Sequence, residues 1–294
     1  MKHFFKESPY SLPVRDFKLH NKMVINFINV KLWYLIPAIS SLSFLSFYSL
    51  FVNYKKNFTN EYIYVQKDIF FYLNRKLSEY ASLQFNLTQL GDILISFSLL
   101  SIFIVYAPKL WEALVTSALL SLIVSASLKK IFSVPRPAAI FDNDSFVIIG
   151  KTLSGNTSLP SGHSIATFVV VTILLFAFMP KKKKTLWFIF MLIVGLAVAL
   201  SRIGVGAHYP LDVVIGSIIG YIVAILGIKI NNKINWLCWI RNRKYYPIFI
   251  LLLIICVGII ITKIVHTNLL ILYVTLSALF VTIYSIIINY VKKY

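Results

Sequence analysis

The sequence predicts an all-α protein built as a polytopic bundle of transmembrane helices. Hydrophobic residues make up 59% of the 294 positions and charged residues only 13%, and the mean hydropathy is +0.80. A soluble domain does not need so many apolar side chains to fill its core. Several apolar stretches also approach the ~20 residues with which a helix crosses a bilayer while satisfying its own backbone hydrogen bonds. We therefore expect the chain to lie in a membrane as a set of helices.

Eight apolar stretches are the candidate spans. They lie at residues 33–52, 89–106, 110–128, 164–179, 186–201, 213–228, 248–264 and 269–291. The first is longer than the ~7–15-residue core of a secretory signal and lacks a small-residue cleavage site, so we expect it to remain as an anchor. An even number of spans places both termini on the same side of the membrane.

The basic residues indicate which side that is, because cytoplasmic loops are enriched in Lys and Arg. The leader at residues 1–31, the loops after the fourth and sixth spans, and the C-terminus are all basic. Their basic residues include Lys2, Lys6, Arg15, Lys18, Lys22, Lys31, Lys181, Lys182, Lys183, Lys184, Lys229, Lys233, Arg241, Arg243, Lys244, Lys292 and Lys293. We predict that both termini are cytoplasmic.

The segment between the first two spans carries a helical pattern of its own. Val65, Ile69, Leu73, Leu77 and Tyr80 recur at three- or four-residue spacing, which predicts an amphipathic helix on the extracytoplasmic side. Two positions for this helix remain open. It can lie in the outer headgroup layer and shape a lipid's approach, or it can simply pack over the bundle.

No internal repeat or low-complexity linker divides the chain. We expect one folded unit in three parts: a cytoplasmic basic leader at residues 1–31, a membrane core at 32–230, and a C-terminal extension of two spans at 231–294.

The placement of the charged residues and cysteines argues against nucleic-acid binding and against a disulfide. The formal net charge of +19 does not indicate nucleic-acid binding, because Lys and Arg punctuate hydrophobic spans and are not gathered on one surface. Cys238 and Cys256 are expected in a cytoplasmic loop and inside a later span, so we expect no disulfide. We see no metal-ligand cluster, expect no metal or cofactor, and find nothing that identifies a protein partner.

Three segments place charge and histidine where a membrane protein normally avoids them. They are Lys129 to Arg136-Pro137 after the third span, Pro160-Ser161-Gly162-His163 before the fourth, and Ser201-Arg202 through His208 to Asp212 between the fifth and sixth. The predicted topology puts all three on the extracytoplasmic face. Together they can form one strongly positive pocket, for which phosphate is the natural guest.

Each residue type has a physical role in such a pocket. Arg136 and Arg202 can each present two donors to phosphoryl oxygens, and Lys129 adds a compact positive charge. Ser161 and Gly162 open a helix, whose free N–H groups and positive dipole end attract an anion. Ser161 can cap that helix or bond the substrate, and Gly162 lets backbone approach an anion closely.

The two histidines suit the roles of nucleophile and acid. His208 lies four residues before Asp212, so the carboxylate can hold one ring nitrogen while the other attacks phosphorus. A phospho-histidine intermediate follows from that attack. His163, at the start of another helix, can then protonate the departing oxygen and later activate water.

These residues resemble the signature of the type 2 phosphatidic acid phosphatase superfamily, which shares its site with the vanadium haloperoxidases. All three parts of the signature are complete, and the similarity covers roughly residues 89–228. The resemblance implies a core of six membrane helices and a metal-independent phosphomonoester or diphosphate hydrolase. In it His208 is the nucleophile, Asp212 orients His208, and His163 is the general acid.

The expected function is that of a bacterial inner-membrane enzyme that removes a phosphate from a lipid at the outer leaflet. A site at membrane level suits a substrate anchored by acyl or prenyl chains. Undecaprenyl diphosphate is the favoured substrate. Phosphatidylglycerol phosphate, phosphatidic acid and a lipid A phosphate stay open, because the signature binds the phosphoryl group and the lipid is held by ordinary apolar surface.

Two other classes compete with this function. A transporter predicts charges or broken helices near the bilayer midplane, whereas the charged set here lies at one interface. A vanadium haloperoxidase shares the pocket, but its known members are soluble.

Asp92, near the outer end of the second span, is expected to be interfacial or to bond another helix, with a role at the site left open. Glu112, near the inner end of the third span, is expected to be interfacial.

Overall fold

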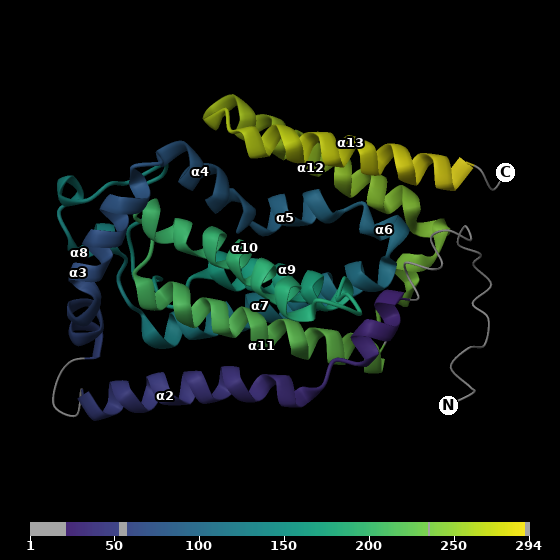
Figure 1. Cartoon of the computed structure of the whole chain (residues 1–294). Coiled ribbons are helices and arrows are strands. Elements are labelled where there is room, and N and C mark those ends of the chain that lie inside the picture. The colour runs from purple at the N-terminus through teal and green to yellow at the C-terminus, as the bar shows by residue number, and fades with distance from the viewer. Residues whose placement is uncertain (1–21, 53–57, 235, 292–294) are drawn as a thin grey trace.

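The structure, a computed structural model, describes residues 22–52, 58–234 and 236–291, and every regular element in these ranges is a helix. The elements are η2 (Leu32–Leu35), α2 (Ile36–Val52), α3 (Phe58–Ser78), α4 (Ala81–Leu90), α5 (Ile93–Leu100), α6 (Phe103–Tyr106), α7 (Pro108–Phe132), α8 (Pro137–Ile140), η3 (Asn143–Ser145), α9 (Gly162–Ala177), α10 (Lys184–Gly204), α11 (Pro210–Ile234), η4 (Cys238–Arg241), η5 (Arg243–Tyr245), α12 (Tyr246–Thr267) and α13 (Leu270–Val291). The long helices lie side by side in a bundle (Figure 1). The all-α class is confirmed.

Most of the predicted spans are long, apolar helices. Within the described ranges, five segments are long and apolar enough to cross a membrane: Pro108–Ile140, Lys184–Gly204, Pro210–Ile234, Arg243–Thr267 and Leu270–Val291. The pair Lys22–Ile28 and Leu32–Leu45, bent by 72°, is a sixth candidate. Helix α9 is apolar but has only 16 residues. The chain is therefore a multi-pass membrane protein.

The second predicted span, at residues 89–106, is not one continuous helix. It is divided into α5, with 8 residues, and α6, with 4. The break falls at Ser101, whose Oγ donates to the carbonyl oxygen of Ser98 at 2.7 Å. Hydropathy alone does not detect this break.

Helix α11 packs closely against α9 and fixes the level at which both helices begin. A Cβ on Gly216 would lie 2.7 Å from the carbonyl oxygen of Ser161, and one on Gly220 would overlap that of Ile165. Small residues allow helix backbones to approach in this way. The backbone N–H of Ser161 donates to the carbonyl oxygen of Asp212 at 3.1 Å. Two of the three polar segments are thereby brought together.

The predicted amphipathic helix is present as α3, which lies crosswise over one end of the bundle (Figure 1). Its apolar pattern is only partly packed on the bundle, since Leu73 and Leu77 contact a hydrophobic cluster while other positions of the pattern are exposed. Val65 and Ile69 are 54% and 55% exposed, whereas Phe70 and Asn74 are buried. The amide of Asn74 donates to the carbonyl oxygen of Ile203 at 2.9 Å. The packed face thus includes an amide, which a search for apolar periodicity does not count.

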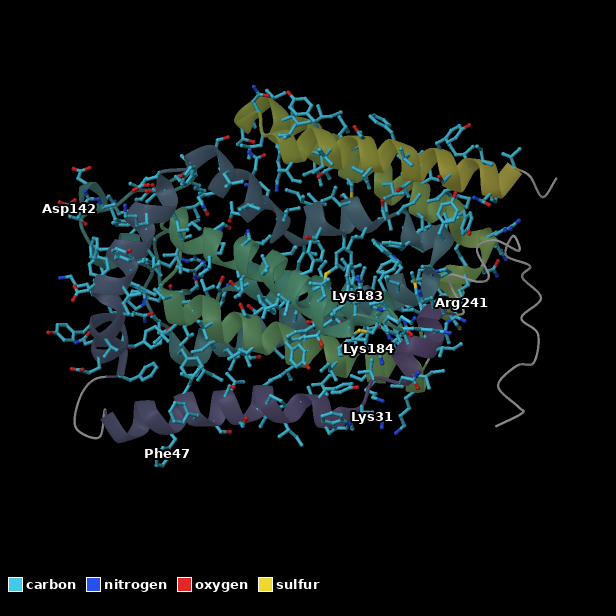
Figure 2. The ribbon with its side chains drawn as sticks, in the orientation of Figure 1. Lys31, Phe47, Asp142, Lys183, Lys184 and Arg241 are labelled. Atoms are coloured by element: carbon cyan, nitrogen blue, oxygen red, sulfur yellow. The ribbon has the colours of Figure 1, made fainter. Side chains whose placement is uncertain are left out.

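The basic residues mark the opposite end of the bundle. Figure 2 shows Lys31, Lys183, Lys184 and Arg241 at one end, and Asp142 beside α3 at the other. Residues 1–21 of the basic leader, Lys292 and Lys293 lie outside the described residues. The four labelled basic residues therefore lie at the end of the bundle opposite the one that α3 crosses (Figure 2).

The C-terminal helices α12 and α13 lie against α4 and α5 (Figure 1). Leu253, Ile260 and Leu279 belong to the same hydrophobic cluster as the interior of the main bundle. At the basic end, Arg241 reaches Glu112 with its Nε at 2.6 Å and its Nη2 at 3.0 Å. Glu112 is fully buried where it pairs with Arg241. The extension is bound to the bundle by apolar packing and by ion pairing.

Candidate active site

The three polar segments meet at the end of the bundle crossed by α3. The first follows α7, the second opens α9, and the third joins α10 to α11. Nη1 of Arg136 lies 3.3 Å from Nε2 of His208, although the two residues are 72 positions apart in the chain. The Ser161–Asp212 backbone bond joins the second segment to the third. Packing of α7, α9, α10 and α11 therefore assembles one site from distant parts of the sequence.

Asp212 is the buried centre of this site and has four neighbouring donors. Its Oδ1 accepts a hydrogen bond from the Tyr62 hydroxyl at 2.7 Å. Its Oδ2 accepts from Ser158 Oγ at 2.6 Å and from the Tyr209 N–H at 2.9 Å. Nδ1 of His208 lies 3.4 Å from the same Oδ2. A buried carboxylate is tolerated when several donors satisfy it. Once held in this way, it fixes the imidazole that faces it.

His208 is almost fully buried and is kept neutral by its surroundings. Burial lowers the pKa of its imidazole well below the ordinary 6.5, and the charges of Arg136, Arg202 and Lys129 lower the pKa further. The neutral tautomer that suits these partners carries its proton on Nδ1, toward Asp212. Nε2 then keeps a lone pair at neutral pH, on the side of the ring that faces Arg136.

Three cations surround this imidazole. Arg136, Arg202 and Lys129 lie close enough to one another to repel electrostatically. Arg202 is only 5% exposed. Its Nη1 donates to Thr88 Oγ1, while its Nε–H has no hydrogen-bond partner among the described residues. Buried polar groups are rarely left unpaired. Mutually repelling cations and an unpaired buried donor are together suited to bind an anion with several oxygens.

The start of α9 forms another wall of the site. Ser161 is the N-cap, and its Oγ accepts from the N–H of Ser164 at 3.3 Å. A Cβ on Gly162 would lie 3.4 Å from Nζ of Lys129, so the glycine leaves the backbone open toward that cation. A cavity of about 360 Å³ is lined by Lys129, Gly162 and His163, among others. Helix N–H groups and a lysine thus face one space.

Asp92 lies in the wall of the same cavity. Its Oδ1 caps α5 by accepting from the N–H of Leu94 at 2.8 Å. Its Oδ2 pairs with Nζ of Lys263 on α12 at 2.7 Å. The expected helix–helix bond is confirmed, and the residue also borders the site.

The sequence did not indicate three residues that hold the site together: Tyr62, Ser158 and Thr88. Ser158 stands two positions before Pro160, so its nearness to a motif was a usable signal. Tyr62 lies three residues before Val65 and so continues the apolar pattern of α3, which gives no sign of a contact with Asp212, and Thr88 lies on α4. Only tertiary packing reveals these two.

No group of three or more His, Cys, Asp or Glu residues in the described part of the chain is arranged to hold a metal ion.

Comparison with known proteins identifies the family. The family model of the PAP2 superfamily matches residues 109–236, which include all eight candidate site residues. A protein of Bacillus licheniformis named bacitracin transport permease protein BcrC is 30% identical over 176 residues, covering 58% of this chain and 82% of that relative. The chain belongs to the PAP2 superfamily. It is a multi-pass membrane protein of the phosphatase class.

Two further comparisons cover less of the chain. A relative from Sulfolobus acidocaldarius named undecaprenyl-diphosphatase is 30% identical over 125 residues, covering 42% of this chain and 56% of that protein. The crystal structure of Aquifex aeolicus LpxE matches 56% of this chain and 95% of its own, with 24% identity and a TM-score of 0.47. Residues beyond 236, with α12 and α13, lie outside the PAP2 match.

Proposed function

We propose that this PAP2 protein removes a phosphate from a lipid diphosphate, with undecaprenyl diphosphate as the substrate and a phospho-histidine as the intermediate. The observation that carries the proposal is the cluster of three cations around a neutral imidazole held by a buried carboxylate. The name of the Sulfolobus relative supports the choice of lipid.

In the first step, Nε2 of His208 attacks the terminal phosphorus while the bond from phosphorus to the bridging oxygen breaks. Arg136, Arg202 and Lys129 stabilise the charge that spreads over the phosphoryl oxygens in the transition state. The unpaired Nε–H of Arg202 gains an acceptor when the phosphoryl group enters. Burial and the charge of Arg202 lower the pKa of His163, which borders the cavity. A bound phosphoryl anion favours the protonated form of His163, which then donates a proton to the departing oxygen.

In the second step, a water molecule attacks the phosphorus of phospho-His208, and the N–P bond breaks. His163, now without its proton, accepts a proton from this water, so inorganic phosphate leaves and both histidines return to their starting states. Asp212 holds Nδ1–H of His208 throughout and stabilises the positive charge on the phosphorylated ring. No metal takes part in either step.

The proposed location is the bacterial inner membrane, with both termini in the cytoplasm and the site outside. Support comes from the charge distribution, because Lys183, Lys184 and Arg241 lie at the end of the bundle opposite α3 (Figure 2). We keep residues 32–230 as the proposed catalytic core and 231–294 as its extension.

The test is phosphate release in detergent from a panel of lipids: undecaprenyl diphosphate, phosphatidylglycerol phosphate, phosphatidic acid and lipid A. We expect the highest kcat/KM for undecaprenyl diphosphate and no loss of turnover with EDTA. His208→Ala should lower turnover on the order of 10³-fold or more. His266→Ala is the matched control, because this exposed histidine lies at the end of α12 and outside the site.

Two results would contradict the proposal. Loss of activity in EDTA would show a metal-dependent reaction, and full turnover by His208→Ala would remove the nucleophile. A higher kcat/KM for one of the other three lipids would keep the phosphatase chemistry but change the assigned substrate.

A further inference from the structure

The helix pair α12–α13, which lies outside the PAP2 match, makes polar contacts with the bundle near the site. Nζ of Lys263 pairs with Asp92, and the N–H of Ile271 donates to Asn86 Oδ1 at 3.0 Å. Farther along, Ser101 Oγ lies 2.8 Å from Thr282 Oγ1. Only the first of these contacts involves charged groups, and only its bundle partner borders the cavity of the candidate site.

A carboxylate such as that of Asp92 is unusual in the wall of a cavity that is proposed to bind a phosphoryl group. It lines the cavity together with Lys129, Gly162 and His163, and its carboxylate acts electrostatically on both His163 and Arg202. An unpaired negative charge there would repel a phosphoryl group. Lys263 supplies the opposite charge at 2.7 Å. The net charge on this wall of the cavity therefore depends on a residue of α12.

The size of this effect follows from Coulomb's law. A unit charge about 10 Å from an anion, at an effective dielectric constant of about 20 to 40, changes the anion's affinity roughly 4- to 15-fold. The pair is partly exposed, with 33% of the Lys263 side chain and 29% of the Asp92 side chain accessible. Solvent screening therefore places the expected change toward the lower end of this range.

We propose that Lys263 is a positioning residue of the active site, which neutralises Asp92 and holds its carboxylate toward α12 and away from the phosphoryl group. The C-terminal helix pair then sets the phosphate affinity of a site formed by other helices. This inference rests on the proposed function in one respect, that the cavity binds a phosphoryl group.

The experiment breaks the ion pair from each side in the full-length protein in detergent. The dissociation constant of orthovanadate, a phosphate analogue, is measured by thermal shift, together with KM and kcat for phosphate release. Lys263→Gln leaves Asp92 unpaired, so vanadate should bind roughly 4-fold more weakly and KM should rise, with kcat little changed. Asp92→Asn leaves Lys263 unpaired, so vanadate should bind as tightly as in the wild type or more tightly. Asparagine also caps a helix well, which preserves α5.

The opposite signs of these two changes distinguish a charge effect from a structural one. If the pair only attached α12 to the bundle, both variants would weaken binding alike. Lys263→Arg should keep wild-type affinity, and Asp92→Asn combined with Lys263→Gln should recover most of the loss. Thr282→Val is the control for attachment, since it removes a contact of the same helix pair without changing charge near the site.

Equal affinities of wild type and Lys263→Gln would overturn the proposal, as would a double variant as weak as Lys263→Gln alone. Should Lys263→Gln not fold, Lys263→Arg and the double variant decide the matter by their affinities. Vanadate binding does not depend on turnover. A wild-type protein that binds vanadate but hydrolyses none of the lipids would therefore contradict the proposed function while leaving this inference testable.

Discussion

Replacing Tyr62 with phenylalanine removes one hydroxyl from the site and leaves the shape of α3 intact. That hydroxyl donates to Oδ1 of Asp212 at 2.7 Å, and both side chains are buried. Burial and the nearby Asp212 charge raise the pKa of Tyr62 well above its ordinary 10.0, so the hydroxyl stays a donor at any pH used for assay. No second donor to Oδ1 is seen among the described residues.

The expected losses of stability and of kcat follow from the charge on Asp212. A hydrogen bond to a charged group contributes about 1.5–3 kcal/mol, so the variant should lose about that much free energy of unfolding. Asp212 keeps its Ser158, Tyr209 and His208 contacts on Oδ2. We therefore expect only the lower part of the loss to reach the transition state, which corresponds to a kcat about tenfold lower. KM should change by less than about twofold, because Tyr62 acts through Asp212 and not on the phosphoryl group.

The assay is steady-state phosphate release in detergent, combined with thermal unfolding. Tyr64→Phe is the matched control, because Tyr64 lies on the same helix with 75% of its surface exposed. A Tyr62→Phe variant with wild-type kcat, or an equal fall in kcat for Tyr64→Phe, would refute the assignment of Tyr62 to the support of Asp212.

Three other changes probe the same region. Tyr209→Phe removes a buried hydroxyl that has no partner among the described residues, so the free energy of unfolding should be unchanged or higher by up to about 1 kcal/mol; a large loss measured by thermal unfolding would contradict this. Because the pKa of His208 is depressed, its imidazole stays neutral to a pH below 6.5, so the acid limb of the pH profile of kcat/KM should lie below pH 6.5. Arg136→Gln removes a neighbouring cation, so this acid limb should move to higher pH. Gly220→Ala should prevent α11 from packing on Ile165 and lower the yield of folded protein, whereas a normal thermal-unfolding midpoint would show that the two helices can separate without cost.

The apolar spans of the fold could be predicted because each is a local property of the sequence. Hydropathy located α7, α10, α11, α12 and α13, since each is a long helix with an apolar window. It did not detect the break between α5 and α6, at Ser101. It also did not indicate Asn74 on the packed face of α3, whose amide donates to the carbonyl oxygen of Ile203 on α10.

The site residues divide in a similar way. Arg136, His208 and Asp212 were visible in the sequence because charged groups near apolar spans are costly and therefore need a reason. The support of Asp212 by Tyr62 was not visible, because their contact joins residues 150 positions apart. The role of Asp92 needed its partner, Lys263, which comes from a helix outside the PAP2 match.

Transfer of the phosphoryl group to His208 can be tested by trapping the phospho-histidine intermediate. The wild-type protein would be mixed with lipid diphosphate carrying a labelled terminal phosphate, quenched in alkali during the first turnover, and digested for mass spectrometry. We expect the label on the imidazole of His208, and none on the chain of His208→Ala. Label on a different side chain, or first-turnover phosphate release at the wild-type rate by His208→Ala, would contradict the account.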